Sequence, residues 1–254
     1  MPICKLCQLE KPLQDSHIVP EFIYKWGGLY NEAKHVMMGI NGAGCRGWKP
    51  LQKGVREHLL CQECERLLNE WYEKPFQRGW FEERPLPRTM GIGDIFDGAW
   101  DYASFKLFHL SILFRCGVST LQTFEEVSLE SHEGCLRNML LSQDPGKADN
   151  YPIFGNVVIN NCGEVERRII SRPIRKRYDG HIAYEQIYAG VRWCISVSSH
   201  LNPDFCQGGL QPDGRMALLA VDWKDIGVLQ DAGKLLSQEN QRGCVSNTYK
   251  QDLT

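Results

Sequence analysis

The stretch CKLCQLEKPLQDSHIVPEF, residues 4–22, holds the pair Cys4 and Cys7, and His17 follows Cys7 by ten residues. A second pair with the same spacing, Cys61 and Cys64, follows in LLCQECERLLN. Four thiolates satisfy Zn²⁺ in a closed tetrahedral site, so two such pairs in one region predict a single structural zinc site. A closed site offers no open position to a substrate, and the cysteines by themselves therefore predict stabilisation of a fold.

Composition limits the class of protein. The chain has 254 residues, 43% of them hydrophobic, which is enough for a sizeable core, and a net charge of -2, which excludes a global basic field for nucleic acid. Its eleven cysteines fit metal binding in a reducing compartment better than disulfides. No apolar run reaches the length of a membrane span, and residues 1–8 have no signal-peptide core, so we expect a cytoplasmic protein without a membrane partner.

The order of sequence patterns predicts an α+β protein in two parts. Residues 1–82 form a zinc-stabilised N-terminal module, in which 27–54 is a long loop with one hairpin and the helix from Cys64 ends at Pro75. The Pro/Gly-rich segment ERPLPRTMGIGD leads into a second domain, 95–254. We expect this domain to be helical over 95–146, with helices at 99–118 and 123–143, β-rich over 150–222, and helical again over 223–242.

The residues that surround the cysteines resemble the HNH endonuclease family, in its Cys4-supported form, over residues 1–80. The shared pattern is a first cysteine pair, an Asp-His-Ile-x-Pro-like strand at Asp15–Pro20, a glycine-rich loop and a Leu-Cys-x-x-Cys helix. The resemblance implies a ββα-metal (treble-clef-like) module. It also implies phosphodiester hydrolysis with His17 as general base and with a catalytic divalent ion, Mg²⁺ or Mn²⁺, beside the structural Zn²⁺.

The chain departs from the family pattern at the metal ligands. Ser16 stands where the family has Asp or His, and Asp15, one place earlier, shares a strand face with His17. A bulge or a turn could bring Asp15 to the catalytic ion as a ligand. The helix ligand has no histidine counterpart, but Glu65, Asn69 and Glu73 recur every four residues, and Glu65 or Asn69 is expected to supply an oxygen ligand. The family's middle Asn, which orients the base, has no clear match; His58 is the nearest polar residue.

Each of these residues also has a purely structural interpretation. His17 could bond a cysteine sulfur or a loop carbonyl, and the acidic helix face could simply be solvated. His109 and His132 fit packing or surface positions. The basic segment ERRIISRPIRKRY is either a phosphate-binding strip or a strand edge protected by charge. The strip would comprise four residues, Arg172, Arg175, Lys176 and Arg177.

Two hypotheses follow. The first is a metal-dependent endonuclease that hydrolyses DNA. The segments FKLFHLSILFRCGVS and VSLESHEGCLRNML are similar to segments of uncharacterised bacterial proteins with this module. The resemblance implies a restriction or anti-phage context and a partner protein of such a defence system. The second is a module that has lost catalysis and binds nucleic acid or protein. Plasmid nicking by wild type and by a His17→Ala variant separates them.

Overall fold

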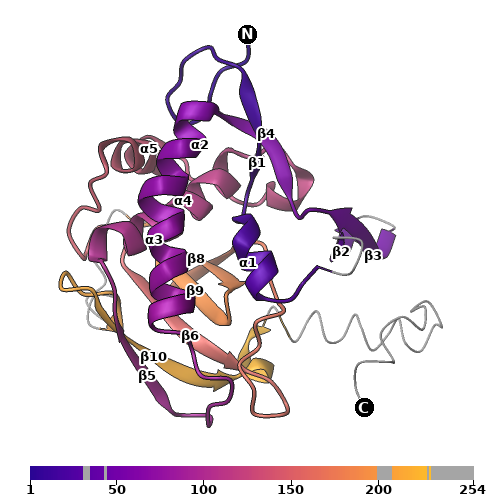
Figure 1. Ribbon diagram of the computed structural model, residues 1–254, viewed down its shortest axis with the longest axis vertical. Helices are drawn as coiled ribbons and strands as arrows, with labels where there is room; N and C mark the ends of the chain where they lie inside the picture. Colours follow the sequence, from indigo (N-terminus) through magenta and orange to yellow (C-terminus); the bar gives the residue numbers. More distant parts are fainter. Residues whose placement is uncertain (31–34, 43–44, 199–207, 228, 230–254) are drawn as a thin grey trace.

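A computed structural model describes residues 1–30, 35–42, 45–198, 208–227 and 229. The described chain is mixed α+β, with helices beside one large sheet, as the sequence predicts (Figure 1). Its strands are β1 Leu13–His17, β2 His35–Gly42, β3 Cys45–Gln52, β4 Arg56–Cys61, β5 Ile95–Ala99, β6 Ile153–Ile159, β7 Ile174–Tyr178, β8 His181–Tyr188, β9 Val191–Ser196 and β10 Arg215–Asp222. Its helices are α1 Glu21–Trp26, α2 Gln62–Leu68, α3 Lys74–Gln77, α4 Tyr102–Val118 and α5 His132–Ser142.

The N-terminal region is built on the antiparallel pair β1 and β4, with α2 directly after β4. The pairing shifts between Gln14 and Asp15, where a bulge lies. Beyond it, Ser16 is buried while Asp15 and His17 lie on the more exposed face, the alternation expected of a strand. The glycine-rich segment contains the predicted hairpin as β2 and β3.

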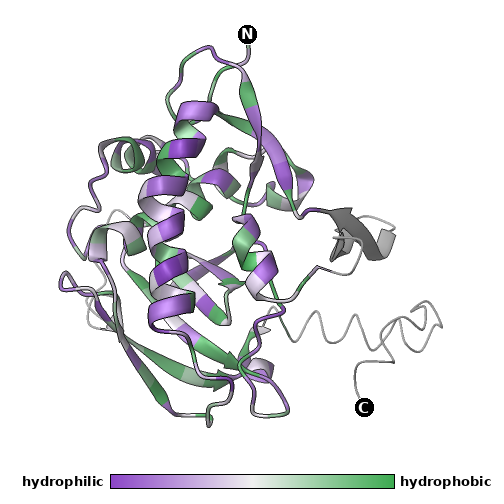
Figure 2. Cartoon of the chain, viewed as in Figure 1, coloured by the Kyte–Doolittle hydropathy of each residue, from purple (hydrophilic) through white to green (hydrophobic). Residues whose placement is uncertain are grey.

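The helix that follows the second cysteine pair does not end at Pro75. It continues from α2 through a π-helical stretch, Asn69–Glu73, into α3 and a second π-helical stretch, Arg78–Glu83. Proline has no N–H to donate to the preceding turn, and the wider turn just before Pro75 accommodates it at the start of α3. Figure 2 shows mostly hydrophilic residues on the outer side of this long helix.

The large sheet has six strands in the order β5-β10-β6-β9-β8-β7. β10 runs parallel to β6, and the other neighbours are antiparallel. The region expected to be helical from residue 95 begins instead with β5, a short edge strand in which a Cβ on Gly98 would lie 2.0 Å from the ring of Trp100. β5 has only five residues, which is too short a stretch for the sequence to show the two-residue hydrophobic period of a strand.

The predicted buried helix at 99–118 is α4, which is capped by Asp101, whose side chain accepts from the Ser104 N–H at 2.8 Å. The predicted helix at 123–143 is shorter, because α5 starts at His132. The hydroxyl of Tyr184 bonds both the N–H of Ser128, at 3.0 Å, and its carbonyl, at 2.7 Å, in place of helical partners, and Glu130 has a φ of 48°. Of the helix predicted at 223–242, the described part begins as a 3₁₀ turn, Trp223–Asp225, and most of the rest lies outside the described residues.

One hydrophobic core extends through both predicted parts of the chain, from Cys4 to Ala220. Phe76 of α3 stacks on Phe108 of α4 with ring centroids 3.7 Å apart, and the indole of Trp80 donates to the carbonyl of Ala189 at 3.3 Å. In the described part of the chain, no helix has both the length and the apolar content needed to cross a bilayer.

Candidate functional site

The four cysteines of the two predicted pairs meet at one point. The sulfur atoms of Cys4, Cys7, Cys61 and Cys64 all lie within 4.8 Å of one another, and those of Cys7 and Cys61 are 3.8 Å apart. Zn–S bonds of ~2.3 Å in a tetrahedron place sulfur atoms ~3.8 Å apart, so the cluster has the dimensions and the donor set of a zinc site. These four cysteines could therefore hold a metal ion such as zinc.

The surroundings of the cluster also fit thiolate ligands. Burial opposes ionisation of Cys4, but backbone N–H groups outweigh it and lower the pKa of this thiol; the N–H of Cys61 donates to its sulfur at 3.3 Å. Burial raises the pKa of Cys61 to about 11. At neutral pH this thiol loses its proton only when a cation is bound, so metal binding here would release protons.

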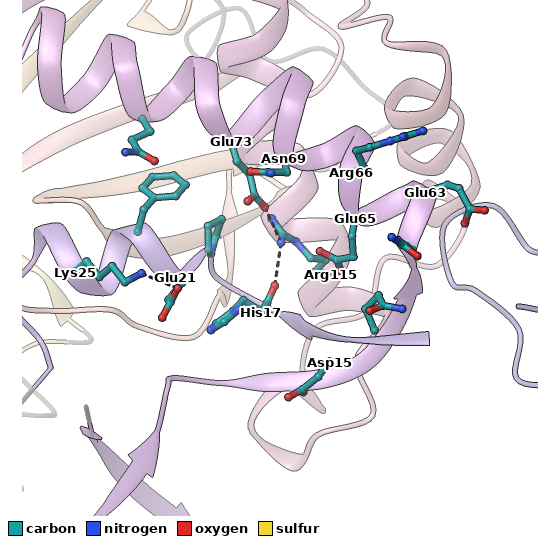
Figure 3. Close-up of a pocket in the computed structure, with 15 residues that line it drawn as sticks. Asp15, His17, Glu21, Lys25, Glu63, Glu65, Arg66, Asn69, Glu73 and Arg115 are labelled. Atoms are coloured by element: carbon teal, nitrogen blue, oxygen red, sulfur yellow. Dashed lines mark hydrogen bonds and ion pairs between the residues drawn. The ribbon is translucent and has the colours of Figure 1, made fainter. Parts of the chain in front are cut away.

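A groove of about 910 Å³ lies beside the cysteine cluster, between β1, α1 and the long helix. His17, Glu65, Asn69, Glu73 and Arg115 line it, and in Figure 3 Arg115 lies between the main-chain carbonyl of His17 and Glu73, with Glu65 next to it. Its other lining residues are Gln14, Asp15, Pro20, Glu21, Phe22, Lys25, Gln62, Glu63, Arg66 and Gln77. The structure thus brings the strand histidine and the helix face with its four-residue repeat to one cavity.

The imidazole of His17 is held by a backbone carbonyl. Its Nε2 lies 2.8 Å from the carbonyl oxygen of Lys53, in the turn between β3 and β4. A carbonyl oxygen only accepts, so the neutral ring carries its proton on Nε2 and its lone pair on Nδ1. Lys53 and Gly54 both have positive φ, 60° and 81°, and this backbone conformation presents the carbonyl to the ring.

The three oxygen-bearing side chains of the long helix stay on one face because of the π-helical stretch. An α-helix advances about 100° per residue, so residues four apart drift by about 40°. A π-helical turn contains more residues, so the stretch Asn69–Glu73 reduces this drift. Burial raises the pKa of Glu73, and the carboxylate of Glu65 adds to this against the opposing charge of Arg115, as expected of neighbours.

Glu65 differs from the other acidic residues of the groove. Each of the others has an ion pair: Asp15 with Arg56, Glu21 with Lys25, Glu63 with Lys11, and Glu73 with Arg115. Within the described residues Glu65 has none, and its Oε1 is buried without a hydrogen-bond donor. A buried carboxylate oxygen in that state requires a cation or water to offset its desolvation.

Arg115 of α4 reaches the centre of this site. Its Nη1 donates to the carbonyl of His17 at 2.9 Å and pairs with Oε1 of Glu73, also at 2.9 Å (Figure 3). The side chain is 1% exposed. Arg115 was not predicted as a site residue from the sequence. A charged residue in a helix that is apolar nearly all round was nevertheless a usable signal, because a buried charge needs a partner.

Other predicted residues lie elsewhere. Asp15 pairs with Arg56 at 2.6 Å and in Figure 3 points away from Glu65. His58, opposite Asp15 on β4, is exposed and does not line the groove. Across the described chain, no group of three or more His, Cys, Asp or Glu side chains other than the cysteine cluster is close enough to hold a metal ion.

The basic segment is separate from the groove, whose lining includes none of its four residues. Arg175, Lys176 and Arg177 are exposed on β7, which is the last strand of the sheet among the described strands. Arg172 pairs with Glu126 at 3.0 Å. The edge position agrees with the alternative that the charges protect a strand edge, and contact with nucleic acid stays a prediction.

His109 is a core residue, as its place in the sequence predicts. It is fully buried, and its Nδ1 lies 2.5 Å from the hydroxyl of Tyr188. His132 bonds the hydroxyl of Tyr151 at 2.9 Å, at the start of α5. Neither ring lines the groove.

Comparisons of the chain with protein-family models, with curated proteins and with solved structures give no match.

Proposed function

We propose that the protein is a metal-dependent endonuclease of the HNH type, with His17 as general base acting on a DNA phosphodiester. The observation that carries this proposal is the bond from His17 Nε2 to the Lys53 carbonyl at 2.8 Å. This bond uses the proton of Nε2 and leaves a lone pair on Nδ1, in a residue that lines the groove. That is the state a general base needs to take a proton from water.

The arrangement of β1, β4 and α2 around the four cysteines supports a ββα-metal module with Zn²⁺ at the cluster. A divalent ion such as Mg²⁺ or Mn²⁺, bound by the oxygen atoms of Glu65 and Asn69, would stabilise the charge that develops on the phosphate. Glu65 fits this role because its buried Oε1 has no donor among the described residues. Asn69 fits it because this residue lines the same groove and its amide offers an uncharged oxygen ligand.

A second function, a nucleic-acid- or protein-binding module without catalysis, is favoured by a specific observation. Asp15, the strand residue expected beside the metal, is engaged by Arg56 at 2.6 Å and is directed away from Glu65. An ion held only by Glu65 and Asn69 would need several water ligands. Mg²⁺ commonly binds proteins in this way, so the first function remains the proposal.

The experiment is nicking of supercoiled plasmid with added Mg²⁺ or Mn²⁺ by wild type, His17→Ala, Glu65→Gln and His58→Ala. His58→Ala is the matched control, since His58 lies on the strand paired with β1 but outside the groove. We expect His17→Ala to lower the rate at least 100-fold and Glu65→Gln to raise the metal concentration required, with His58→Ala at the wild-type rate.

Equal nicking by wild type and His17→Ala overturns the general-base role. No nicking by wild type, with DNA binding retained in a gel shift, establishes the binding module instead. The restriction or anti-phage context and the partner protein implied by the family resemblance belong to this proposal and are tested by phage challenge of cells that express wild type or His17→Ala.

A further inference from the structure

We propose that Arg115 is the positioning residue of the general base: from α4 it fixes the main chain of β1 at His17 and so holds the imidazole in place. The inference rests on the proposed role of His17 and adds a residue from outside the region that resembles a nuclease.

Arg115 is itself rigidly held. Its Nε donates to the carbonyl of Ser111 at 3.3 Å and its Nη2 to the Ser111 hydroxyl at 3.3 Å, while Nη1 meets the His17 carbonyl and Glu73. A guanidinium is planar and permanently charged, so these bonds fix its orientation as well as its position. At 1% exposure it is almost completely shielded from solvent.

The contact is placed where the base needs support. His17 is the last residue of β1, where the ladder with β4 ends at the pair His17 and Arg56. The Lys53 carbonyl restrains the ring, and Arg115 restrains the backbone that carries it. A ring held at one point pivots about it, whereas two restraints define the direction of Nδ1. Displacements of about 1 Å at a catalytic group cost on the order of 100-fold in rate.

A second arginine provides a matched control. Arg137 of α5 donates from Nε to the carbonyl of Lys5 at 3.2 Å and also pairs with a glutamate, Glu133. It therefore ties a later helix to the N-terminal region in the same chemical manner, but near the first cysteine pair and not at His17. If both arginines only tie the helices to the N-terminal region, their substitution should change the nicking rate to the same extent. If Arg115 positions His17, only the substitution of Arg115 should lower the rate.

The test measures kcat and KM for nicking of a short duplex by wild type, Arg115→Lys and Arg137→Lys at equal zinc content. Arg115→Lys keeps the buried charge beside Glu73 but cannot reproduce the planar set of bonds. We expect kcat to fall about 10- to 100-fold with KM within twofold of wild type, and Arg137→Lys to match wild type. Because an unpaired Glu73 endangers folding, the pair is removed together: Arg115→Met with Glu73→Gln should lower kcat a further 10-fold or more relative to Glu73→Gln alone.

A readout independent of activity separates this inference from the proposed function. Long-range ¹H–¹⁵N NMR of the His17 ring, at a pH where it is neutral, should show the Nε2–H form alone in wild type and in Arg137→Lys, and both tautomers in Arg115→Lys. A single tautomer with unchanged kcat in Arg115→Lys overturns the inference. If wild type does not cleave DNA, the nuclease proposal fails while the NMR result still decides whether Arg115 holds the ring.

Discussion

His17 illustrates how one side chain is adjusted by its surroundings. Burial lowers its pKa; the Lys53 carbonyl and Glu21 oppose the shift, and Arg56 and Arg115 reinforce it. We predict an NMR titration midpoint below the ordinary value of 6.5 in the folded protein, returning to about 6.5 in urea. The proposed base is then neutral at pH 7, and if it acts in nicking, the acid limb of the nicking rate should also lie below 6.5. A folded midpoint above 6.5 would contradict this account of the site.

Gly54 supports the site through its backbone. Its φ is 81°, and an added Cβ would lie 2.8 Å from Cζ of the Tyr24 ring. Gly54→Ala should therefore lower the free energy of unfolding and the nicking rate, because the adjoining Lys53 carbonyl moves. Gly180→Ala is the control, with φ of 85° and open space around the new Cβ, and should cost about 1 kcal/mol without loss of nicking. Urea unfolding measures both, and equal costs would argue against the contact with Tyr24.

At the scale of secondary structure, α4 joins the groove to the sheet through buried polar groups. His109 is fully buried against Tyr188 of β8, and burial holds its pKa well below 6.5. The unfolded chain thus binds a proton below pH 6.5 that the folded chain does not, so stability is lost as pH falls through the unfolded value. We predict that the free energy of unfolding falls by up to about 1.4 kcal/mol per pH unit below 6.5.

The comparison for this prediction is His109→Asn, whose amide lies near the position of Nδ1 and can still hydrogen-bond the Tyr188 hydroxyl but does not titrate. The difference between the pH slopes of wild type and variant isolates His109 from the protonation of cysteine ligands. Parallel slopes would show that His109 already binds its proton in the folded state.

Elements with a clear period were predictable from the sequence, and those decided by distant contacts were not. The apolar run of α4 and the spacing of the paired cysteines can be recognised in the local sequence. The passage of the long helix through Pro75 depends on a π-helical turn, and the late start of α5 depends on a hydroxyl 56 residues further along the chain, on Tyr184. In the candidate site, His17, Glu65 and Asn69 were found by pattern, whereas Arg115 and the Lys53 carbonyl reach it only through the tertiary fold.

At the scale of the whole molecule, we expect metal binding at the cysteine cluster to be coupled to folding, because Cys4, Cys61 and Cys64 belong to the common hydrophobic core. We predict about one zinc ion per chain. Cys61→Ser should lose the zinc and lower the melting temperature, whereas Cys162→Ser, at an exposed turn outside the cluster, should keep both. Metal analysis and thermal unfolding of the two variants measure this, and a zinc-free wild type of unchanged stability would refute the assignment.

The contacts of Phe76, Trp80 and Arg115 have a consequence for attempts to divide the protein. A protease cut in the Pro/Gly-rich segment at 83–94 would break the chain between two parts that share one core. The two fragments should then co-elute in gel filtration, and coexpressed as separate polypeptides they should complement each other. The N-terminal fragment on its own would expose its aromatic side chains and leave Glu73 without Arg115. Residues 1–82 should thus not fold or function as an independent unit, and the proposed nuclease activity should require the rest of the chain.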